Sequence, residues 1–286
     1  MRVADRVIVV TGGANGIGRA MVRRFHREGA ALVVADLDEW AGREVAGEVG
    51  GLFVRTDVAD GEQVQALASA ATEAHGRIDV FCSNAGILGA GGPEAPIETW
   101  QRGWDVNVMA HVYAARAVLP SMLERGEGYL VQTVSAAGLL SNPGAAPYTV
   151  TKHAALAFAE WLSITYGDRG VRVSCVCPQT VRTNLITGSG DLVRDVMLAV
   201  ADPLEPEDVA QAVIEGMEQE AFLILPHPEV AEYFRRKADD PERWLRGMRR
   251  LNARLLGGGP PAPDAGPPAP DAGPPLPDNG PPPPGG

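Results

Sequence analysis

A tyrosine and a lysine stand at a spacing that suits proton transfer. Tyr148 and Lys152 are four residues apart, so a helix that begins near Tyr148 places both side chains on one face, in adjacent turns. A tyrosine with the ordinary pKa of about 10 is a poor base at neutral pH. A neighbouring ammonium stabilises the phenolate and lowers that pKa. We therefore predict that Lys152 lowers the pKa of Tyr148 and makes it a general acid or base.

Ser135 completes this candidate group. It follows a predicted strand, and its hydroxyl would hydrogen-bond the substrate oxygen on which charge develops. Each residue also has an ordinary interpretation when it is taken alone. A tyrosine at a helix start often packs against the core, a lysine four residues on is often solvated, and a serine after a strand often belongs to a turn. The functional interpretation depends on the three occurring together.

A glycine-rich turn lies near the start of the sequence. An apolar strand leads directly into Thr11–Gly18, which contains Gly12, Gly16, Ile17 and Gly18, and an amphipathic helix follows. Glycines at such a junction let the backbone approach a phosphate, and the helix N-terminus supplies free N–H groups. The context predicts a dinucleotide-binding turn. The alternative is a tight turn without a ligand.

The end of the second predicted strand indicates which dinucleotide binds. Asp36 follows the glycine turn at the distance where a carboxylate accepts hydrogen bonds from the adenosine ribose hydroxyls. A carboxylate there would repel a 2′-phosphate, and the next residues, Leu37 and Asp38, supply no positive charge to neutralise one. We therefore predict NAD as the cofactor. The alternative for Asp36 is a helix cap, which Asp38 could supply equally well.

Two further predicted strands end in polar residues. Asp57 and Val58 follow the third strand and could flank the adenine ring, whereas Asn84 and Gly86 follow the fourth. Ligands of open parallel sheets bind beyond the carboxyl ends of the strands, so these residues are predicted to join the cofactor site. The alternatives are a helix cap at Asp57 and a plain turn at Asn84 and Gly86.

The elements between these groups follow two alternating patterns. Short runs rich in β-branched residues predict strands, and longer amphipathic segments predict helices. Their alternation predicts an α/β fold, with a doubly wound, Rossmann-type parallel sheet of about seven strands and helices on both faces. The predicted strands are Val7–Val10, Ala31–Ala35, Leu52–Val54, Val80–Cys82, Tyr129–Val134, Val171–Val176 and Phe222–Leu225, and the predicted helices include Gly16–Arg27, Gly61–Ala74, Trp100–Leu123 and Tyr148–Tyr166.

Three motifs give the chain a resemblance to a known family. Thr11–Gly18 matches T-G-x-x-x-G-x-G, Asn84–Gly86 matches N-A-G, and Tyr148–Lys152 matches Y-x-x-x-K. Over about residues 4–226 the sequence resembles the single-domain branch of the short-chain dehydrogenase/reductase family. The resemblance implies hydride transfer between a nicotinamide cofactor and an alcohol or ketone. It also implies a homo-oligomer, a tetramer or a dimer.

The resemblance adds residues that spacing alone does not indicate. Asn107 matches the asparagine that completes the family's catalytic tetrad with Ser135, Tyr148 and Lys152. By resemblance, Asn107 kinks its helix and holds a water in a proton relay through Lys152. Tyr148 and Lys152 also belong to the cofactor site, where Lys152 binds the nicotinamide ribose.

A third stretch after the sixth strand matches the family's P-G-x-V-x-T. By resemblance, Val181 and Thr183 contact the nicotinamide carboxamide and the pyrophosphate. Gln179 stands where the family has glycine, which puts the shape of this turn and of the nearby substrate pocket in doubt.

The chain divides into one domain and a tail. Residues 1–256 are predicted to form a single catalytic domain that includes a docking helix within Pro226–Leu256. Residues 257–286 are rich in proline and glycine, with a glycine every seventh residue, and are predicted to be disordered. Asn184–Asp202 is predicted to be a mobile lid over the site.

Composition limits the partners. The formal net charge of −11 and the sequence pI of about 5.0 argue against a nucleic acid partner, which needs a basic patch. The basic run Arg235–Lys237 is interpreted as a solvated helix face. We expect no membrane span, no signal peptide and thus a cytoplasmic location. The cysteines, Cys82, Cys175 and Cys177, are expected to be buried free thiols, and no metal site is expected.

These observations predict an NAD-dependent oxidoreductase that interconverts a secondary alcohol and a ketone. The predicted pocket walls, Ile87–Pro96 and Gly138–Pro147, are mostly apolar and favour an uncharged, apolar substrate. Two alternatives stay open. The chain could be a catalytically inactive dinucleotide-binding sensor or scaffold, which a broken tetrad would favour, or an NADP-dependent ketone reductase, which Asp36 argues against.

Overall fold

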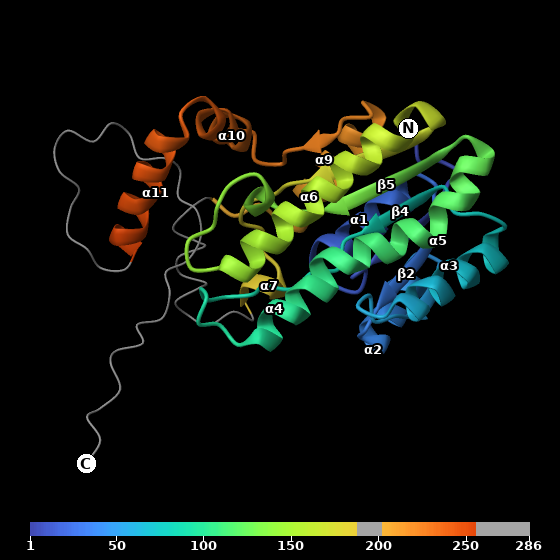
Figure 1. Cartoon of the computed structure of the whole chain (residues 1–286). Coiled ribbons are helices and arrows are strands. Elements are labelled where there is room, and N and C mark those ends of the chain that lie inside the picture. Colours follow the sequence, from blue (N-terminus) through green and yellow to red (C-terminus); the bar gives the residue numbers. More distant parts are fainter. Residues whose placement is uncertain (188–201, 256–286) are drawn as a thin grey trace, which may run out of the picture.

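The computed structural model describes residues 1–187 and 202–255. Its centre is a seven-stranded parallel sheet in the order β3-β2-β1-β4-β5-β6-β7 (Figure 1). The chain winds from β1 outwards to β3 and then returns to β4 on the other side of β1. This reversal leaves a crevice at the carboxyl ends of β1 and β4, where doubly wound sheets bind their ligands.

The seven predicted strands are confirmed, each to within one residue at either end. Strands β1 and β4 are buried along their whole length because helices cover both faces of the sheet. The strands are β1 (Val7–Thr11), β2 (Ala31–Asp36), β3 (Leu52–Arg55), β4 (Val80–Ser83), β5 (Gly128–Thr133), β6 (Val171–Val176) and β7 (Leu223–Ile224).

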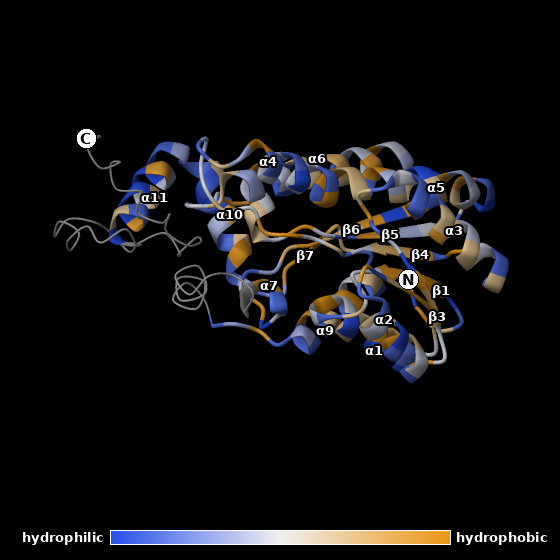
Figure 2. Cartoon of the chain, turned by 90° about the horizontal axis from the view of Figure 1, so that it is seen from below, coloured by the Kyte–Doolittle hydropathy of each residue, from blue (hydrophilic) through white to orange (hydrophobic). Residues whose placement is uncertain are grey.

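The helices form one layer on each face of the sheet, and a separate hydrophobic cluster lies under each layer (Figure 2). Helices α1 (Gly16–Arg27), α2 (Glu39–Glu48) and α9 (Pro206–Glu218) cover one face. Helices α3 (Gly61–His75), α4 (Ile97–Trp104), α5 (Ala110–Arg125) and α6 (Ala146–Tyr166) cover the other. The predicted α/β class, with helices on both faces, is confirmed.

The predicted helix Trp100–Leu123 is interrupted. A π-helical turn, Asp105–Met109, joins α4 to α5. A π-turn adds a residue to a helical repeat and is frequent at functional sites. Asn107 lies at the middle of this turn, where the family resemblance implied a kink.

The segment predicted as one docking helix is two. Helix α10 (Glu229–Asp239) ends before Pro241, and α11 (Pro241–Leu255) begins there. Proline disfavours a helical conformation in the residue before it, so Asp240 breaks the run. Trp244 and Met248 of α11 are buried in the hydrophobic cluster. A short helix α7 (Asn184–Thr187) begins the predicted lid. The rest of the lid up to residue 201 and the tail lie outside the described residues.

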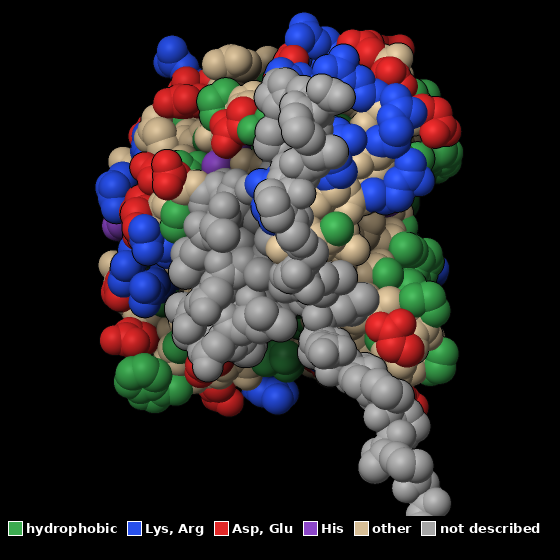
Figure 3. Space-filling view, turned by 90° about the vertical axis from the view of Figure 1, so that its left-hand side faces the viewer, with side chains coloured by type: hydrophobic (Ala, Val, Ile, Leu, Met, Phe, Trp, Pro, Cys, Tyr) green, Lys and Arg blue, Asp and Glu red, His purple; other side chains and the backbone are tan. Residues whose placement is uncertain are grey.

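The interpretation of Arg235–Lys237 as a solvated face is wrong for Lys237. Its ammonium is half-buried and donates to the backbone oxygen of Leu139 at 2.7 Å, which ties α10 to the segment after β5. Arg235 and Arg236 are exposed and pair with Glu232. Basic and acidic side chains are mixed on this face of the molecule (Figure 3).

The structure also bears on the expectations about cysteines, metal sites and membrane-spanning helices. The three cysteines are buried and free, and burial raises their pKa values. Within residues 1–187 and 202–255, no group of histidine, cysteine and acidic side chains could hold a metal ion. No helix in this part of the chain is long and apolar enough to cross a membrane.

Candidate active site

The glycine turn between β1 and α1 has a backbone that larger residues would disturb. Gly12 and Gly16 have φ angles of +63° and +50°, a region that favours glycine. A Cβ on Gly18 would lie 2.0 Å from the backbone oxygen of Gly12, so only glycine lets the helix start this close to the turn. Asn15 makes no side-chain capping bond to α1. The first N–H groups of α1 can therefore bind an anion.

Asp36 at the end of β2 presents a fixed carboxylate. The backbone N–H of Ala14 donates to Oδ2 and that of Asp38 donates to Oδ1, both at 3.0 Å. Asp38 is the residue that caps α2, through a bond from Ala41 N, so the capping alternative for Asp36 is wrong. Each carboxylate oxygen accepts more than one hydrogen bond, so Asp36 can still accept bonds from two ribose hydroxyls.

Asp57 after β3 does not cap the next helix either. Asp60 caps α3 by accepting two backbone N–H groups of its first turn. Asp57 instead accepts the N–H of Ala59 through Oδ1, and its Oδ2 lies 3.5 Å from Arg102 Nη2. Asp57 and the buried Val58 line the same cavity as Asp36.

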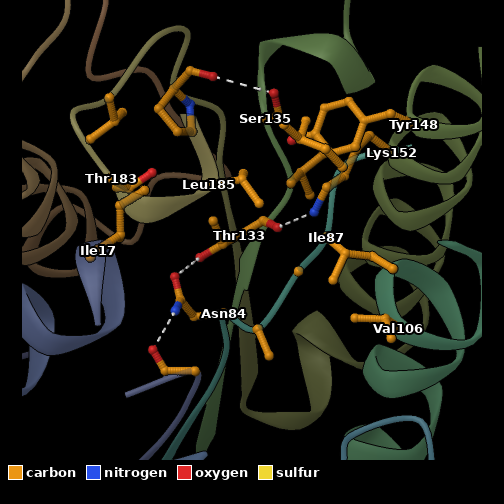
Figure 4. Close-up of a pocket in the computed structure, with 18 of the residues that line it drawn as sticks. Ile17, Asn84, Ile87, Val106, Thr133, Ser135, Tyr148, Lys152, Thr183 and Leu185 are labelled. Atoms are coloured by element: carbon orange, nitrogen blue, oxygen red, sulfur yellow. Dashed lines mark hydrogen bonds between the residues drawn. The ribbon is translucent and has the colours of Figure 1, made fainter. Parts of the chain in front are cut away.

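Asn84 ties three strand ends together. Its Nδ2 donates to the backbone oxygen of Thr11 at 3.0 Å, and its Oδ1 accepts from Thr133 Oγ1 at 3.0 Å. Thr11 Oγ1 in turn accepts the backbone N–H groups of Asn84 and Ala85. Asn84 therefore does more than form a turn, because it holds β1, β4 and β5 at the crevice (Figure 4). Gly86 also lines the cavity.

Tyr148, Ser135 and Lys152 meet at one end of the cavity (Figure 4). Tyr148 and Lys152 lie on the buried face of α6. Ser135 has a φ of +128° at the end of the β5 segment. Its Oγ accepts the N–H of Ala137 at 3.1 Å and donates to the backbone oxygen of Pro178 at 3.4 Å. These bonds fix the position of the serine hydroxyl on the cavity wall.

The pKa of Tyr148 shifts in the direction opposite to the prediction. Burial raises the pKa of Tyr148, and the nearby hydroxyl of Ser135 counteracts this only in part. Lys152 Nζ lies 5.6 Å from the centre of the Tyr148 ring and donates to the backbone oxygen of Thr133 at 3.0 Å. Burial lowers the pKa of Lys152 to about 8. In the protein alone, desolvation of the phenol therefore sets the direction in which the pKa of Tyr148 shifts.

Asn107 lies behind these three residues and is fully buried. Its side chain exchanges two hydrogen bonds with the backbone of Ile87, both of 3.0 Å, and Nδ2 also donates to Thr151 Oγ1 at 3.2 Å. The side chain thus connects the loop after β4 to α6. The tetrad that the sequence predicted is assembled, with Asn107 behind the cavity wall.

The stretch after β6 returns to the glycine turn. Val181 is buried and forms an isolated bridge with Leu204. Thr183 covers the turn, since a Cβ on Gly16 would lie 3.0 Å from its methyl carbon. Both residues line the cavity, as the resemblance implied.

Gln179 is held by a residue that the sequence did not indicate. Its backbone N–H donates to Nδ1 of the buried His227 at 3.1 Å. Its Oε1 is buried and has no hydrogen-bond partner within the described parts of the chain. Gln179 lines the cavity at the position where the family has glycine.

One cavity of about 410 Å³ collects these groups. Of the site residues that the sequence predicted, all but Gly18 and Asn107 line it. Thr11 and Thr133 are the functional residues that sequence reasoning missed. Thr11 is the first residue of the glycine motif, so the sequence contained a sign of its role. Thr133 acts partly through its backbone oxygen, and a role of the backbone cannot be recognised from the residue type.

The fold and the site together place the protein in the class of dinucleotide-binding oxidoreductases with an α/β fold. The model of the family described as short chain dehydrogenase matches residues 6–191. The protein belongs to the short-chain dehydrogenase/reductase family, whose members bind a nicotinamide dinucleotide.

Relatives and solved structures agree with this assignment. The chain is 37% identical over 249 residues to a 1-deoxy-11-beta-hydroxypentalenate dehydrogenase of Streptomyces exfoliatus, which covers 84% of this chain and 90% of the relative. It is 36% identical over 217 residues to a meso-2,3-butanediol dehydrogenase of Serratia marcescens, covering 73% and 86%. A short-chain dehydrogenase/reductase of Burkholderia phymatum, solved in complex with NAD, superposes with a TM-score of 0.78 at 31% identity, covering 85% of this chain and 96% of that one.

The residues present fit a nicotinamide dinucleotide. The glycine turn packs closely, since a Cβ on Gly18 would collide with the backbone of Gly12, and the N-terminus of α1 beside it has no side-chain cap, so its free N–H groups can bind a pyrophosphate. Asp36 ends β2, the glycine turn follows the adjacent β1, and Ser135, which lines the cavity with Tyr148 and Lys152, follows β5. Across the sheet, these groups follow the order adenosine, pyrophosphate and nicotinamide ribose.

Proposed function

We propose that the protein is an NAD-dependent oxidoreductase that interconverts a secondary alcohol and a ketone, with Tyr148 as the general acid and base. The observation that carries this proposal is that Ser135, Tyr148 and Lys152 line the same cavity, with Lys152 Nζ 5.6 Å from the centre of the Tyr148 ring. A substrate oxygen in this cavity can reach both the serine and the phenol hydroxyl.

The proposed mechanism assigns one task to each residue of this chain. Ser135 orients the substrate oxygen, and Tyr148 takes its proton in oxidation or returns one in reduction. Lys152 holds positive charge beneath the phenol, and Asn107 fixes the loop against which the substrate lies. A bound nicotinamide supplies the hydride acceptor or donor and, when oxidised, further positive charge. That charge opposes the rise that burial causes in the pKa of Tyr148.

The preference for NAD over NADP is supported by Asp36. Its carboxylate is fixed by the N–H groups of Ala14 and Asp38. A 2′-phosphate at this position would meet a like charge, and the two residues that follow, Leu37 and Asp38, supply no positive charge.

The substrate is proposed to be an uncharged, fairly apolar alcohol or ketone. Around Tyr148 the cavity wall is mainly apolar and includes Leu88, Leu140 and Leu185. Arg102 also lines the cavity, but its guanidinium pairs with Asp57, which disfavours a role in binding an anionic substrate. The name of one relative, a meso-2,3-butanediol dehydrogenase, describes a small uncharged hydroxylated substrate.

We further propose a cytoplasmic homo-oligomer, a tetramer or a dimer. The outer face of α6 supports an interface, because Trp161 and Ile164 are 53% and 84% exposed. Large apolar side chains exposed together on one helix face often mark an interaction surface.

A panel of cofactors and substrates tests the proposal. The purified full chain is offered NAD or NADP with secondary alcohols of increasing size, and NADH or NADPH with the matching ketones. Turnover with NAD and an apolar secondary alcohol is expected. Preference for NADP would overturn the cofactor assignment, and cofactor binding without any turnover across the panel would favour a sensor.

A further inference from the structure

Ser135 has a backbone conformation that is rare for a residue with a side chain. Its φ and ψ are +128° and 155°, a combination that glycine adopts and that other residues adopt only under strain. Such a conformation persists only where the surrounding contacts hold it in place. The contacts that hold the backbone of Ser135 therefore also decide where its hydroxyl lies in the cavity.

Two segments meet at this serine, one after β5 and one after β6. The backbone N–H of Ser135 donates to the oxygen of Val176, the last residue of β6, at 3.2 Å. The backbone oxygen of Pro178 accepts the N–H of Ala136 at 2.8 Å and the serine hydroxyl at 3.4 Å. The turn after the serine continues to Leu139, whose N–H donates to Ala136 at 3.0 Å. A shift of either segment would thus move the serine hydroxyl.

Helix α10 holds the segment after β5 through one lysine. Lys237 Nζ donates to the backbone oxygen of Leu139 at 2.7 Å and lies 3.3 Å from His153 Nε2 on α6. Burial lowers the pKa of His153, so its ring is neutral at pH 7. Its Nδ1 lies 2.9 Å from the backbone oxygen of Thr149 and must donate there, which leaves Nε2 to accept from Lys237. The lysine thus joins α10 both to the serine turn and to α6.

The segment after β6 is held from the other end of α10. His227 precedes this helix by two residues and is 4% exposed. Its Nδ1 accepts the backbone N–H of Gln179, which directly follows Pro178, at 3.1 Å. Pro226 and Pro228 flank the histidine, and a proline restricts its own backbone and that of the residue before it. The position of His227 is therefore coupled to that of α10.

Helix α10 connects the two segments from outside the cavity. Its Val230 is fully buried in the hydrophobic cluster on the α5 and α6 side of the sheet, and Tyr233 packs against that cluster. Neither His227 nor Lys237 lines the cavity. The hydrogen bonds at the two ends of the helix nevertheless complete a closed circuit that passes through the turn at Ser135.

We propose that Lys237 and His227 are positioning residues through which α10 holds Ser135 in its strained conformation, so that a helix outside the cavity sets the efficiency of the active site. The proposal rests on the proposed hydride-transfer function, in which the serine hydroxyl binds the substrate oxygen. A hydrogen-bond donor stabilises developing charge only when its position is fixed beforehand. A displacement of about 1 Å can lower a rate on the order of a hundredfold.

Hydrogen exchange tests this connection without reference to activity. In the full chain, Lys237→Met is expected to speed amide exchange in residues 135–140, as measured by mass spectrometry. Arg236→Met is the matched control, because it removes the same charge from the adjacent residue, which pairs with Glu232 at the surface, and it should change nothing there. Unchanged protection in Lys237→Met would overturn the proposal. If the protein turns over no substrate of the panel but exchange changes as expected, the proposed function fails while the connection stands.

Steady-state kinetics tests the effect on the serine. Lys237→Met is expected to lower kcat about tenfold, a part of the 10²–10³ that loss of a transition-state hydrogen-bond donor costs. The KM for NAD should stay within about twofold, because the missing contact acts on the transition state. Lys237→Arg keeps a cationic donor and should recover most of the activity, whereas Arg236→Met should have the wild-type kcat. A wild-type kcat in Lys237→Met would contradict the proposal.

A double-mutant cycle with Ser135 separates positioning from a general loss of stability. If Lys237 acts through the serine hydroxyl, Lys237→Met should lower kcat by less than about twofold in a Ser135→Ala background. Equal falls in both backgrounds would show that the lysine only stabilises the fold and would refute the positioning role. Should Lys237→Met fail to fold, His227→Phe carries the same tests. His227→Asn, which keeps an acceptor for the N–H of Gln179, is then the variant expected to recover activity.

Discussion

Lys152 donates a hydrogen bond to the backbone oxygen of Thr133 at 3.0 Å, and the hydroxyl of Thr133 donates to Asn84 at the same distance. The lysine is thereby hydrogen-bonded to the carboxyl end of β5 and not to the tyrosine one turn before it. Its ammonium is buried at this anchor, and burial lowers the pKa of Lys152 from 10.5 to about 8.

The buried charge of Lys152 predicts a gain in stability when it is removed. A pKa that falls from 10.5 to about 8, at about 1.4 kcal/mol per unit, corresponds to roughly 3 kcal/mol at neutral pH. The lost bond to Thr133 offsets part of this. Lys152→Met should therefore unfold at higher denaturant concentration than the wild type at pH 7, with loss of activity.

The pH dependence of that gain follows from linkage. Between pH 8 and 10.5 the unfolded chain holds the lysine proton and the folded chain has released it, so the wild type gains stability as pH rises relative to the variant. The advantage of Lys152→Met should shrink across this window in urea titrations at several pH values. An advantage that is constant from pH 7 to 10 would contradict a buried, titrating Lys152.

Asp36 should control cofactor choice. Asp36→Ser removes the carboxylate that would bind the ribose hydroxyls, a hydrogen bond to a charged group of about 1.5–3 kcal/mol, so the KM for NAD should rise about tenfold or more. The ratio of kcat/KM for NADP to that for NAD should rise as well. Steady-state kinetics with both cofactors measures this.

Asp38→Ser is the matched control for that substitution. It removes the same charge two residues away and keeps a residue that can cap α2. Its cofactor preference should stay that of the wild type. Equal effects of the two substitutions would show that net charge near the turn, and not Asp36 itself, selects the cofactor.

Gln179 should shape the substrate end of the cavity. Gln179→Gly restores the family residue and removes a side chain from the cavity wall. The KM for NAD should stay within about twofold, whereas kcat/KM should shift in favour of bulkier alcohols, since an added methylene in a pocket is worth about 1–3 kcal/mol. An unchanged order of substrates across the alcohol panel would show that Gln179 does not contact the substrate.

Much of the fold could be predicted because its signals are local. Buried parallel strands are continuous apolar runs, and the turn at Gly12–Gly18 needs glycine for reasons of space. The break between α10 and α11 was missed although Pro241 signalled it. The π-turn at Asn107 has no signal in residue periodicity, and only the family resemblance indicated it.

The site was predicted as a set of residues but not as an electrostatic environment. The four residues of the tetrad are brought together, and Asp36 and Asp57 are freed from capping by Asp38 and Asp60. The pKa of Tyr148 could not be predicted, because it depends on how deeply the phenol is buried. Sequence spacing reports which groups are neighbours and not how much solvent each has lost.

The pairing of Gln179 with His227 shows the same limit. The two residues lie far apart in the sequence, and their contact depends on where the segment after β7 crosses the end of β6. No motif connects them. Contacts of this kind follow from the packing of whole elements, which is why a substitution in a family motif could be noticed but not interpreted.

The most direct test of the central claim is the comparison of wild type with Tyr148→Phe. Both proteins are titrated with NADH and then assayed with NAD and the best alcohol of the panel. We predict that Tyr148→Phe binds NADH with an affinity close to that of the wild type while kcat falls by about 10²–10⁴. A Tyr148→Phe enzyme that turns over at the wild-type rate would contradict the assignment of Tyr148 as the proton-transferring residue.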